Sequence, residues 1–276
     1  MYHKGNNNAS LDDTPTSSSL YNALPHIDSM KSAATEHAAA RGTLLKIIAR
    51  HGLQHHFSIH LVHKHFDIPE GRIMVYETVT GPNHPSFILC SPRAPEKCEN
   101  LRGLYFQARP GGTMAAYEYT TELGEDLSSY TDFVSEFSTT VTRLRVQDVF
   151  ALTAKKPESA RFTEFEMPDL NSTVLVTNVN WLPLSSVPPT STDWITNCGL
   201  EGGIITLTDC TKTTSGSHYN FTCSRTRSGV HYQQKGVWVD DGKGGMEQQF
   251  FLNGVPVPQD SEPFAIISRA NQMVTA

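Results

Sequence analysis

Short apolar runs separated by turn signals are the feature of this sequence that most limits its fold. Such runs occupy residues 72–80, 86–90, 101–108 and 113–121, and Gly81-Pro82 and Pro110-Gly111-Gly112 are among the turns that bound them. Strands end at Pro and Gly pairs of this kind, and runs of this length are typical of strands in an antiparallel sheet. The sequence therefore predicts an antiparallel β meander, or a barrel-like sheet, over residues 56 to 121.

Two segments have the apolar periodicity of helices. Residues 29–51 are rich in Ala, Leu, Lys and Arg, and they are followed by Gly52. Glycine is common at the position just after a helix. Residues 129–145 carry an apolar stripe that we expect to pack across the meander, formed by Tyr130, Phe133, Val134, Phe137, Val141 and Leu144.

Further strands are expected at 172–178, 203–209, 217–223 and 230–239. The predicted class is α+β, with one or two helices packed on the sheet and a second half that is mostly β.

The domain organisation follows from composition. Residues 1–27 form a polar tract with little to bury, so we expect a disordered N-terminal arm. Residues 28–276 are interpreted as a single α+β domain, and a break near residue 156, where Thr, Ser, Gly and Pro become frequent, is the alternative.

Charge and motifs exclude several classes of function. The 22 Lys and Arg residues against 28 Asp and Glu residues give a formal net charge of −6 without a basic block, so neither nucleic acid nor a membrane is an expected partner. No apolar stretch reaches the length of a membrane span, and the first 30 residues are polar, which predicts a cytoplasmic protein. The sequence contains no G-x-S-x-G, G-x-G-x-x-G or kinase signature.

Histidine is concentrated in one stretch, since six of the twelve histidines fall between His51 and His65. We interpret residues 57–66 as a strand that forms a β-hairpin with residues 72–80. His63 and His65 then share one face with apolar neighbours, about 7 Å apart at Cα, a separation across which two imidazoles can bind one ion. His60 lies on the opposite face. Imidazole is both a common metal ligand and the side chain best suited to proton transfer near neutral pH.

The stretch His63-Lys64-His65 followed by Glu70 reads H-x-H-x4-E and resembles the first metal-binding motif of cupins. The resemblance implies a divalent metal bound by His63, His65 and Glu70 on strands of a small barrel, with a later histidine as fourth ligand. His218 and His231 are the candidates for that ligand. The sequence departs from the cupin pattern because Phe57 and Glu77 stand where the family has glycines.

A second resemblance covers residues 57 to 75. This segment is similar to uncharacterised fungal proteins that carry a Leu-x-His-x-His-Phe stretch before an Asp-x-Pro turn, here Leu61 to Phe66 and Asp67 to Pro69. Those proteins have no known activity, so this resemblance implies no role for the histidines.

Together these patterns predict an enzyme that acts on a small-molecule substrate, either by acid–base catalysis or through one divalent metal such as Fe, Cu or Zn. The expected catalytic residues are His63, His65, His60 and Glu118, and the expected metal ligands are His63, His65 and Glu70, with His84 as a further residue that could complete the site. The alternative is a non-catalytic binding or structural protein whose His-rich strand is part of the core.

Overall fold

The structure is a computed structural model that describes residues 11–12, 14–154, 162–177, 190–196, 204–210, 221–227, 230–232, 238–240, 246–252 and 254–275. The chain forms two compact units that alternate along the sequence. The first unit comprises Met1–Val75, Arg93–Arg161 and Thr190–Asp209. The second comprises Tyr76–Pro92, Phe162–Pro189 and Cys210–Ala276. The sequence predicts a single domain, with a break near residue 156 as the alternative. One of the boundaries between the two units follows Arg161, close to that alternative break.

A β-sheet forms the centre of the first unit. Its neighbouring strands, in spatial order, are β1 (Leu11–Asp12), β6 (Met114–Thr120), β5 (Arg102–Ala108), β7 (Phe150–Thr153), β2 (Ser58–Leu61), β10 (Thr190–Thr196) and β11 (Ile204–Cys210). β1 is parallel to β6, whereas the pairs β6–β5, β5–β7, β7–β2 and β2–β10 are antiparallel. All four residues of β2 are buried, so this strand is covered on both faces.

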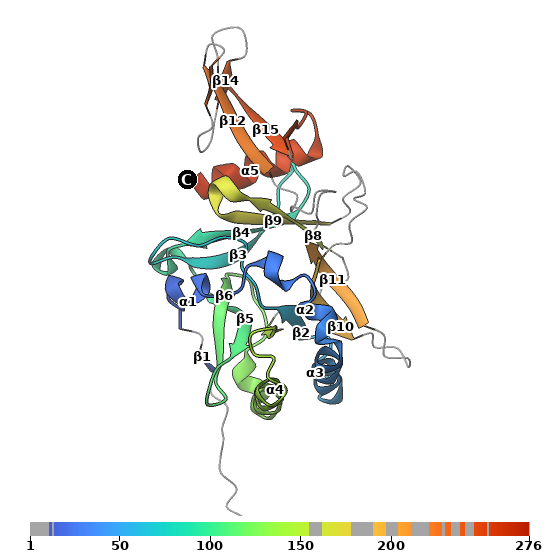
Figure 1. Ribbon diagram of the computed structural model, residues 1–276. Helices are drawn as coiled ribbons and strands as arrows, with labels where there is room; N and C mark the ends of the chain where they lie inside the picture. The colour runs from blue at the N-terminus through green and yellow to red at the C-terminus, as the bar shows by residue number, and fades with distance from the viewer. Residues whose placement is uncertain are drawn as a thin grey trace, which may run out of the picture. The chain divides into compact units, whose positions relative to one another are not determined.

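Two helices of the first unit pack against each other and against this sheet. α3 (Ala38–Arg50) contacts β2 and β10, and α4 (Thr131–Leu144) contacts β5; Figure 1 shows the two helices near each other. Shorter helical segments are α1 (Ser18–Asn22), η1 (Ile27–Met30), α2 (Ala33–Glu36), η2 (Pro95–Lys97) and η3 (Leu127–Tyr130). α3 stops before Gly52, whose φ of 71° is a backbone conformation that glycine adopts without strain.

The apolar stripe of α4 faces the core, as its periodicity predicts. Phe133 and Phe137 are buried, and the ring of Phe133 stacks on Phe57 with centroids 5.1 Å apart. Aromatic contacts of this kind bury large apolar areas and fix the position of the helix. The α4 helix is therefore anchored by the residue that immediately precedes β2.

The second unit has strands β3 (Ile73–Val79), β4 (Phe87–Arg93), β9 (Ser172–Thr177) and β8 (Phe162–Met167) as successive neighbours, with η4 (Pro168–Leu170) between β8 and β9. A second sheet contains β13 (Val230–Tyr232), β12 (Phe221–Arg227), β15 (Met246–Leu252) and β14 (Trp238–Asp240), with β16 (Val255–Pro256) beside β15. The last element is α5 (Glu262–Thr275), whose Ile266, Ile267 and Ala270 share one buried cluster with Val79 and Phe87.

The α+β class and most expected elements are confirmed. The helix of residues 131–144 and the strands β3, β4, β5, β6, β9 and β11 lie where the patterns place them. The helix expected over residues 29–51 begins only at Ala38, because η1 and α2 occupy part of the chain before it. The predicted hairpin of residues 57–66 with 72–80 is wrong, because β2 pairs with β7 and β10. β2 also ends at Leu61, so His63 and His65 follow the strand and do not lie on it. A turn signal specifies a reversal of the chain, but it does not specify which strand becomes the partner.

The expectation of a disordered arm is wrong for residues 14 to 27. This stretch contains α1, and Tyr21, Leu24 and Ile27 are buried. Within this polar stretch, burial of the three apolar residues contributes to fixing the segment. α5 is an element that our reading of the sequence missed, although its apolar residues have helical spacing. No helix within the described residues is long and apolar enough to cross a bilayer.

Removing an aromatic ring from the α4 stripe tests the packing of the first unit. We expect Phe137→Ala to lower the free energy of unfolding by about 3 to 5 kcal/mol, because the side chain is fully buried and its loss leaves a cavity. Leu123→Ala is the control, since Leu123 is 97% exposed and its truncation is expected to change stability by less than about 0.5 kcal/mol. Urea unfolding followed by circular dichroism measures the free energy of unfolding of both variants. Equal losses in Phe137→Ala and Leu123→Ala would contradict the packing described for α4.

Glu125 gives a pH-dependent prediction. Its carboxylate accepts hydrogen bonds from His56 Nδ1 at 2.6 Å and from the Tyr130 hydroxyl at 2.8 Å. The hydrogen bond from His56 is the largest cause that lowers the pKa of Glu125 below its usual 4.5. A depressed carboxyl pKa stabilises the fold above the unfolded-state pKa, and this stabilisation disappears as the pH falls through the folded-state pKa. We therefore expect Glu125→Gln to lose less stability than the wild type on acidification below about pH 4.5, measured as melting temperature against pH. If the melting temperatures of the wild type and of Glu125→Gln fell equally with pH, the stabilising role of the Glu125 carboxylate would be contradicted.

Candidate functional site

The structure brings three of the predicted site residues together in the first unit. His60 lies on β2, and His63 and His65 lie in the extended segment that follows it. The side chains of His60 and His63 are buried, with 4% and 5% of their surfaces exposed, and His65 is half-buried. The rings of His60 and His63 stack with centroids 5.2 Å apart, and those of His63 and His65 meet edge to face at 4.9 Å.

His63 and His65 direct their Nε2 atoms at each other across 3.2 Å. His63 Nδ1 lies 2.7 Å from the carbonyl oxygen of Leu61, which can only accept, so Nδ1 carries the proton and Nε2 keeps its lone pair when the ring is neutral. A backbone carbonyl in this position is the usual outer partner of a histidine that binds a metal. With Zn–N bonds of about 2.0 to 2.1 Å, tetrahedral geometry places two ligand nitrogens about 3.3 Å apart. The observed separation fits two ligands of one ion.

His60 borders a buried acidic group. Its Nδ1 lies 3.7 Å from Oδ2 of Asp193, its register partner on β10, and its ring stacks on Tyr105 with centroids 3.8 Å apart. Neither ring nitrogen of His60 makes a hydrogen bond with a described residue, and Asp193 Oδ1 also has no such bond there. Buried polar atoms in this state raise the free energy of the fold.

The series of rings continues to Tyr117 on β6, whose centroid is 6.2 Å from that of Tyr105. Burial raises the pKa of Tyr117 well above 10, and the charges of Glu118 and Asp193 raise it further. The hydroxyl of Tyr117 therefore stays protonated at physiological pH. It makes no hydrogen bond with any described residue, so its proton is available to another acceptor.

The other predicted residues are placed differently. Glu118 is buried on β6, opposite Tyr105 of β5. Glu70 lies exposed in the turn before β3, and no metal-sized group of His, Cys, Asp and Glu in the described part of the chain includes it. His84 belongs to the second unit. His218 lies outside the described residues, and for His231 only the backbone, on β13, is described.

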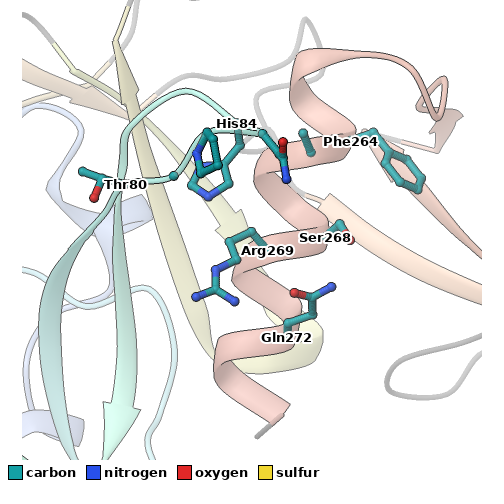
Figure 2. Close-up of a pocket in the computed structure, with 10 residues that line it drawn as sticks. Thr80, His84, Phe264, Ser268, Arg269 and Gln272 are labelled. Atoms are coloured by element: carbon teal, nitrogen blue, oxygen red, sulfur yellow. The ribbon is translucent and has the colours of Figure 1, made fainter.

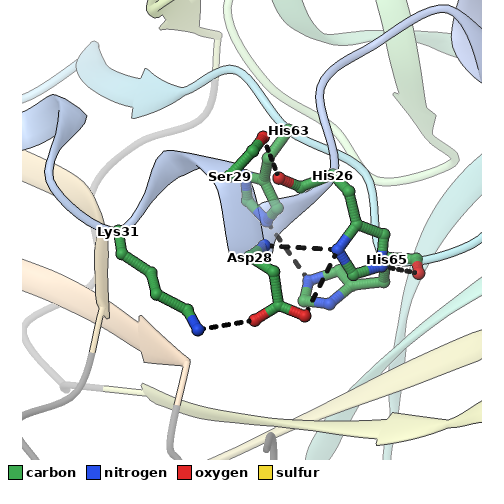
Figure 3. Close-up of polar contacts among 6 residues, drawn as sticks. All are labelled: His26, Asp28, Ser29, Lys31, His63 and His65. Atoms are coloured by element: carbon green, nitrogen blue, oxygen red, sulfur yellow. Dashed lines mark hydrogen bonds and ion pairs between the residues drawn. The ribbon is translucent and has the colours of Figure 1, made fainter. Parts of the chain in front are cut away.

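The N-terminal segment holds the chain that carries His63 and His65. The backbone N–H of Lys64 donates to the carbonyl oxygen of Pro25, and the N–H of Ile27 donates to the carbonyl oxygen of Lys64; each hydrogen bond is 2.9 Å long. His26 Nε2 donates to the carbonyl oxygen of His65 at 2.8 Å, as Figure 3 shows. Further along, the Asn22 side chain accepts from Ile68 N at 2.8 Å and donates to Ile68 O at 3.0 Å. We call residues 22 to 27 the clamp, because they fix both ends of residues 64–68.

Residues that the sequence reading missed contribute much of this arrangement. Asp193 and Tyr105 meet His60, and Tyr117 meets Tyr105, only through strand register, which no local pattern in the sequence encodes. The clamp falls within the stretch expected to be disordered. Its one available signal was the apolar spacing of Tyr21, Leu24 and Ile27 in a polar tract.

The clamp can be tested at Asn22. We expect Asn22→Ala to speed hydrogen exchange of the Ile68 amide and to lower the free energy of unfolding by about 1 to 3 kcal/mol, because a buried donor loses its acceptor. Asn22→Asp keeps an acceptor for that amide, so its exchange is expected to stay close to that of the wild type. Exchange followed by mass spectrometry or NMR measures both variants. Unchanged exchange in Asn22→Ala would show that the clamp does not hold residues 64–68.

Comparison of the chain with protein-family models, with curated proteins and with solved structures found no match in any of the three. The resemblances to cupins and to the fungal proteins therefore stay predictions.

Proposed function

We propose that the protein is a small-molecule enzyme whose centre is a divalent metal ion bound by His63 and His65. The observation that supports this most directly is the 3.2 Å separation of the two Nε2 atoms, with the tautomer of His63 set by the Leu61 carbonyl. Two neutral imidazoles are suitable ligands for Zn, Cu and Fe. Coordination positions not taken by protein side chains remain for water and substrate.

The bound ion would supply Lewis acidity toward a substrate oxygen. The chain's own residues add acid–base groups next to the ligands. His60 stacks on His63 and has ring nitrogens without hydrogen bonds to described residues, so it can exchange a proton with a substrate held by the pair. Asp193 beside it, with Oδ2 3.7 Å from His60 Nδ1, would help to orient the His60 ring.

The same residues favour a second candidate, an enzyme that performs acid–base catalysis without metal. The specific observation is the buried His60 and Asp193 pair, whose Nδ1 and Oδ2 atoms are 3.7 Å apart. In that case the 3.2 Å contact is a hydrogen bond in which His65 Nε2 donates to His63 Nε2. A non-catalytic protein with these histidines in its core is the remaining alternative, and it predicts an effect on stability alone.

Metal content separates the candidates. We expect near-stoichiometric Zn, Fe or Cu in untagged wild type, measured by elemental analysis, and its loss in His63→Gln/His65→Gln. Cobalt binding, followed by its visible absorption, should weaken at least about 100-fold in that variant, because the altered residues are the two proposed histidine ligands. His37→Gln/His55→Gln removes two histidines outside the site and is expected to bind cobalt as the wild type does.

The outcomes of this experiment are distinct. Absence of metal and of any cobalt spectrum in the wild type would contradict the metal centre. Loss of activity in His60→Gln with no dependence on metal would then support the acid–base enzyme. If the wild type binds no metal, and His63→Gln/His65→Gln and His60→Gln change only the melting temperature, the non-catalytic alternative is supported.

A further inference from the structure

A pocket of about 460 Å³ lies within the second unit, and its lining includes none of the residues of the proposed metal site. One wall is the connection between β3 and β4, residues 80 to 84, and the other wall is α5. Figure 2 shows Ser268, Arg269 and Gln272 on the helix and His84 on the connection. Val79 and Phe87, which flank the connection, share a buried cluster with Ile266, Ile267 and Ala270, so a common core supports both walls.

The charge of the lining indicates the charge of a ligand. Arg269 is the one Lys or Arg among the lining residues, and no Asp or Glu is among them, although the whole chain has a net charge of −6. Arg269 makes no ion pair with a described residue, in contrast to Arg50 and its partner Glu136. A guanidinium group binds a carboxylate through two parallel hydrogen bonds. The pocket is therefore suited to an organic anion.

His84 adds a second requirement. Its Nδ1 donates to the carbonyl oxygen of Pro85 at 2.9 Å, so in the neutral ring Nε2 is an acceptor. No described residue forms a hydrogen bond with that nitrogen. The ring lies close over Gly81, where a Cβ atom would stand 2.7 Å from Nε2. A ligand that satisfies this acceptor needs a hydroxyl or similar donor.

We propose that the pocket binds a small organic carboxylate that also carries a hydroxyl group. Arg269 binds the carboxylate, and His84 Nε2 accepts the hydrogen bond of the hydroxyl. The amide and hydroxyl groups of Asn83, Ser268 and Gln272 supply further hydrogen bonds. A volume of about 460 Å³ accommodates a molecule of ordinary metabolite size.

The test uses two ligands that differ by one hydroxyl group, 3-phenyllactate and 3-phenylpropionate. Isothermal titration of the full chain should give saturable binding of both, with 3-phenyllactate bound several-fold more tightly. Arg269→Gln is expected to weaken both at least about tenfold, because a charge-assisted hydrogen bond is lost. Arg143→Gln, which removes an exposed arginine of α4, should leave binding unchanged.

Two variants test the role of His84. His84→Phe keeps an aromatic ring but lacks the acceptor, and Gly81→Ala displaces the ring, so both should abolish the preference for 3-phenyllactate. The proposal is overturned if the wild type binds neither compound at millimolar concentration, or if Arg269→Gln binds both as the wild type does. Equal affinity of the wild type for the two compounds would overturn the role assigned to the hydroxyl group.

Discussion

The central position of β2 determines the arrangement of the first unit. This four-residue strand forms hydrogen bonds with β7 on one side and β10 on the other, and all its residues are buried. The first pairing holds the strand in the sheet, and the second brings Asp193 opposite His60. Phe57, just before the strand, anchors α4, and His63, just after it, enters the candidate site. One short strand thus connects the hydrophobic packing of the unit to its buried polar groups.

Those polar groups have a cost that the surrounding packing offsets. His60 and Asp193 are almost excluded from water, yet they lack the full set of hydrogen bonds that buried polar groups normally make within the described structure. The stacking of His60 on Tyr105 and the burial of large aromatic side chains around α4 provide favourable free energy in the same unit. The packing of the first unit therefore accommodates buried polar groups whose hydrogen bonds are incomplete within the described residues.

The sequence predicted the local elements better than their partners. The strands near residues 73–79 and 114–120 and the α4 helix follow from alternation, punctuation and a 3.6-residue period, which are local properties. The choice of histidines followed from their clustering. The neighbours of His60 could not be predicted, because Asp193 reaches it through pairing of strands far apart in the chain. The roles of Asn22 and His26 were missed because a polar composition indicated disorder.

The alternation of the two units along the chain has a consequence for biosynthesis. His60 is made early, whereas β10 with Asp193 follows only after part of the second unit has been synthesised. On the ribosome, the nascent first unit must therefore keep one edge of β2 without its final partner until β10 emerges. An open strand edge of this kind is prone to aggregation, so protection of the unfinished sheet during translation becomes a requirement for obtaining the folded protein.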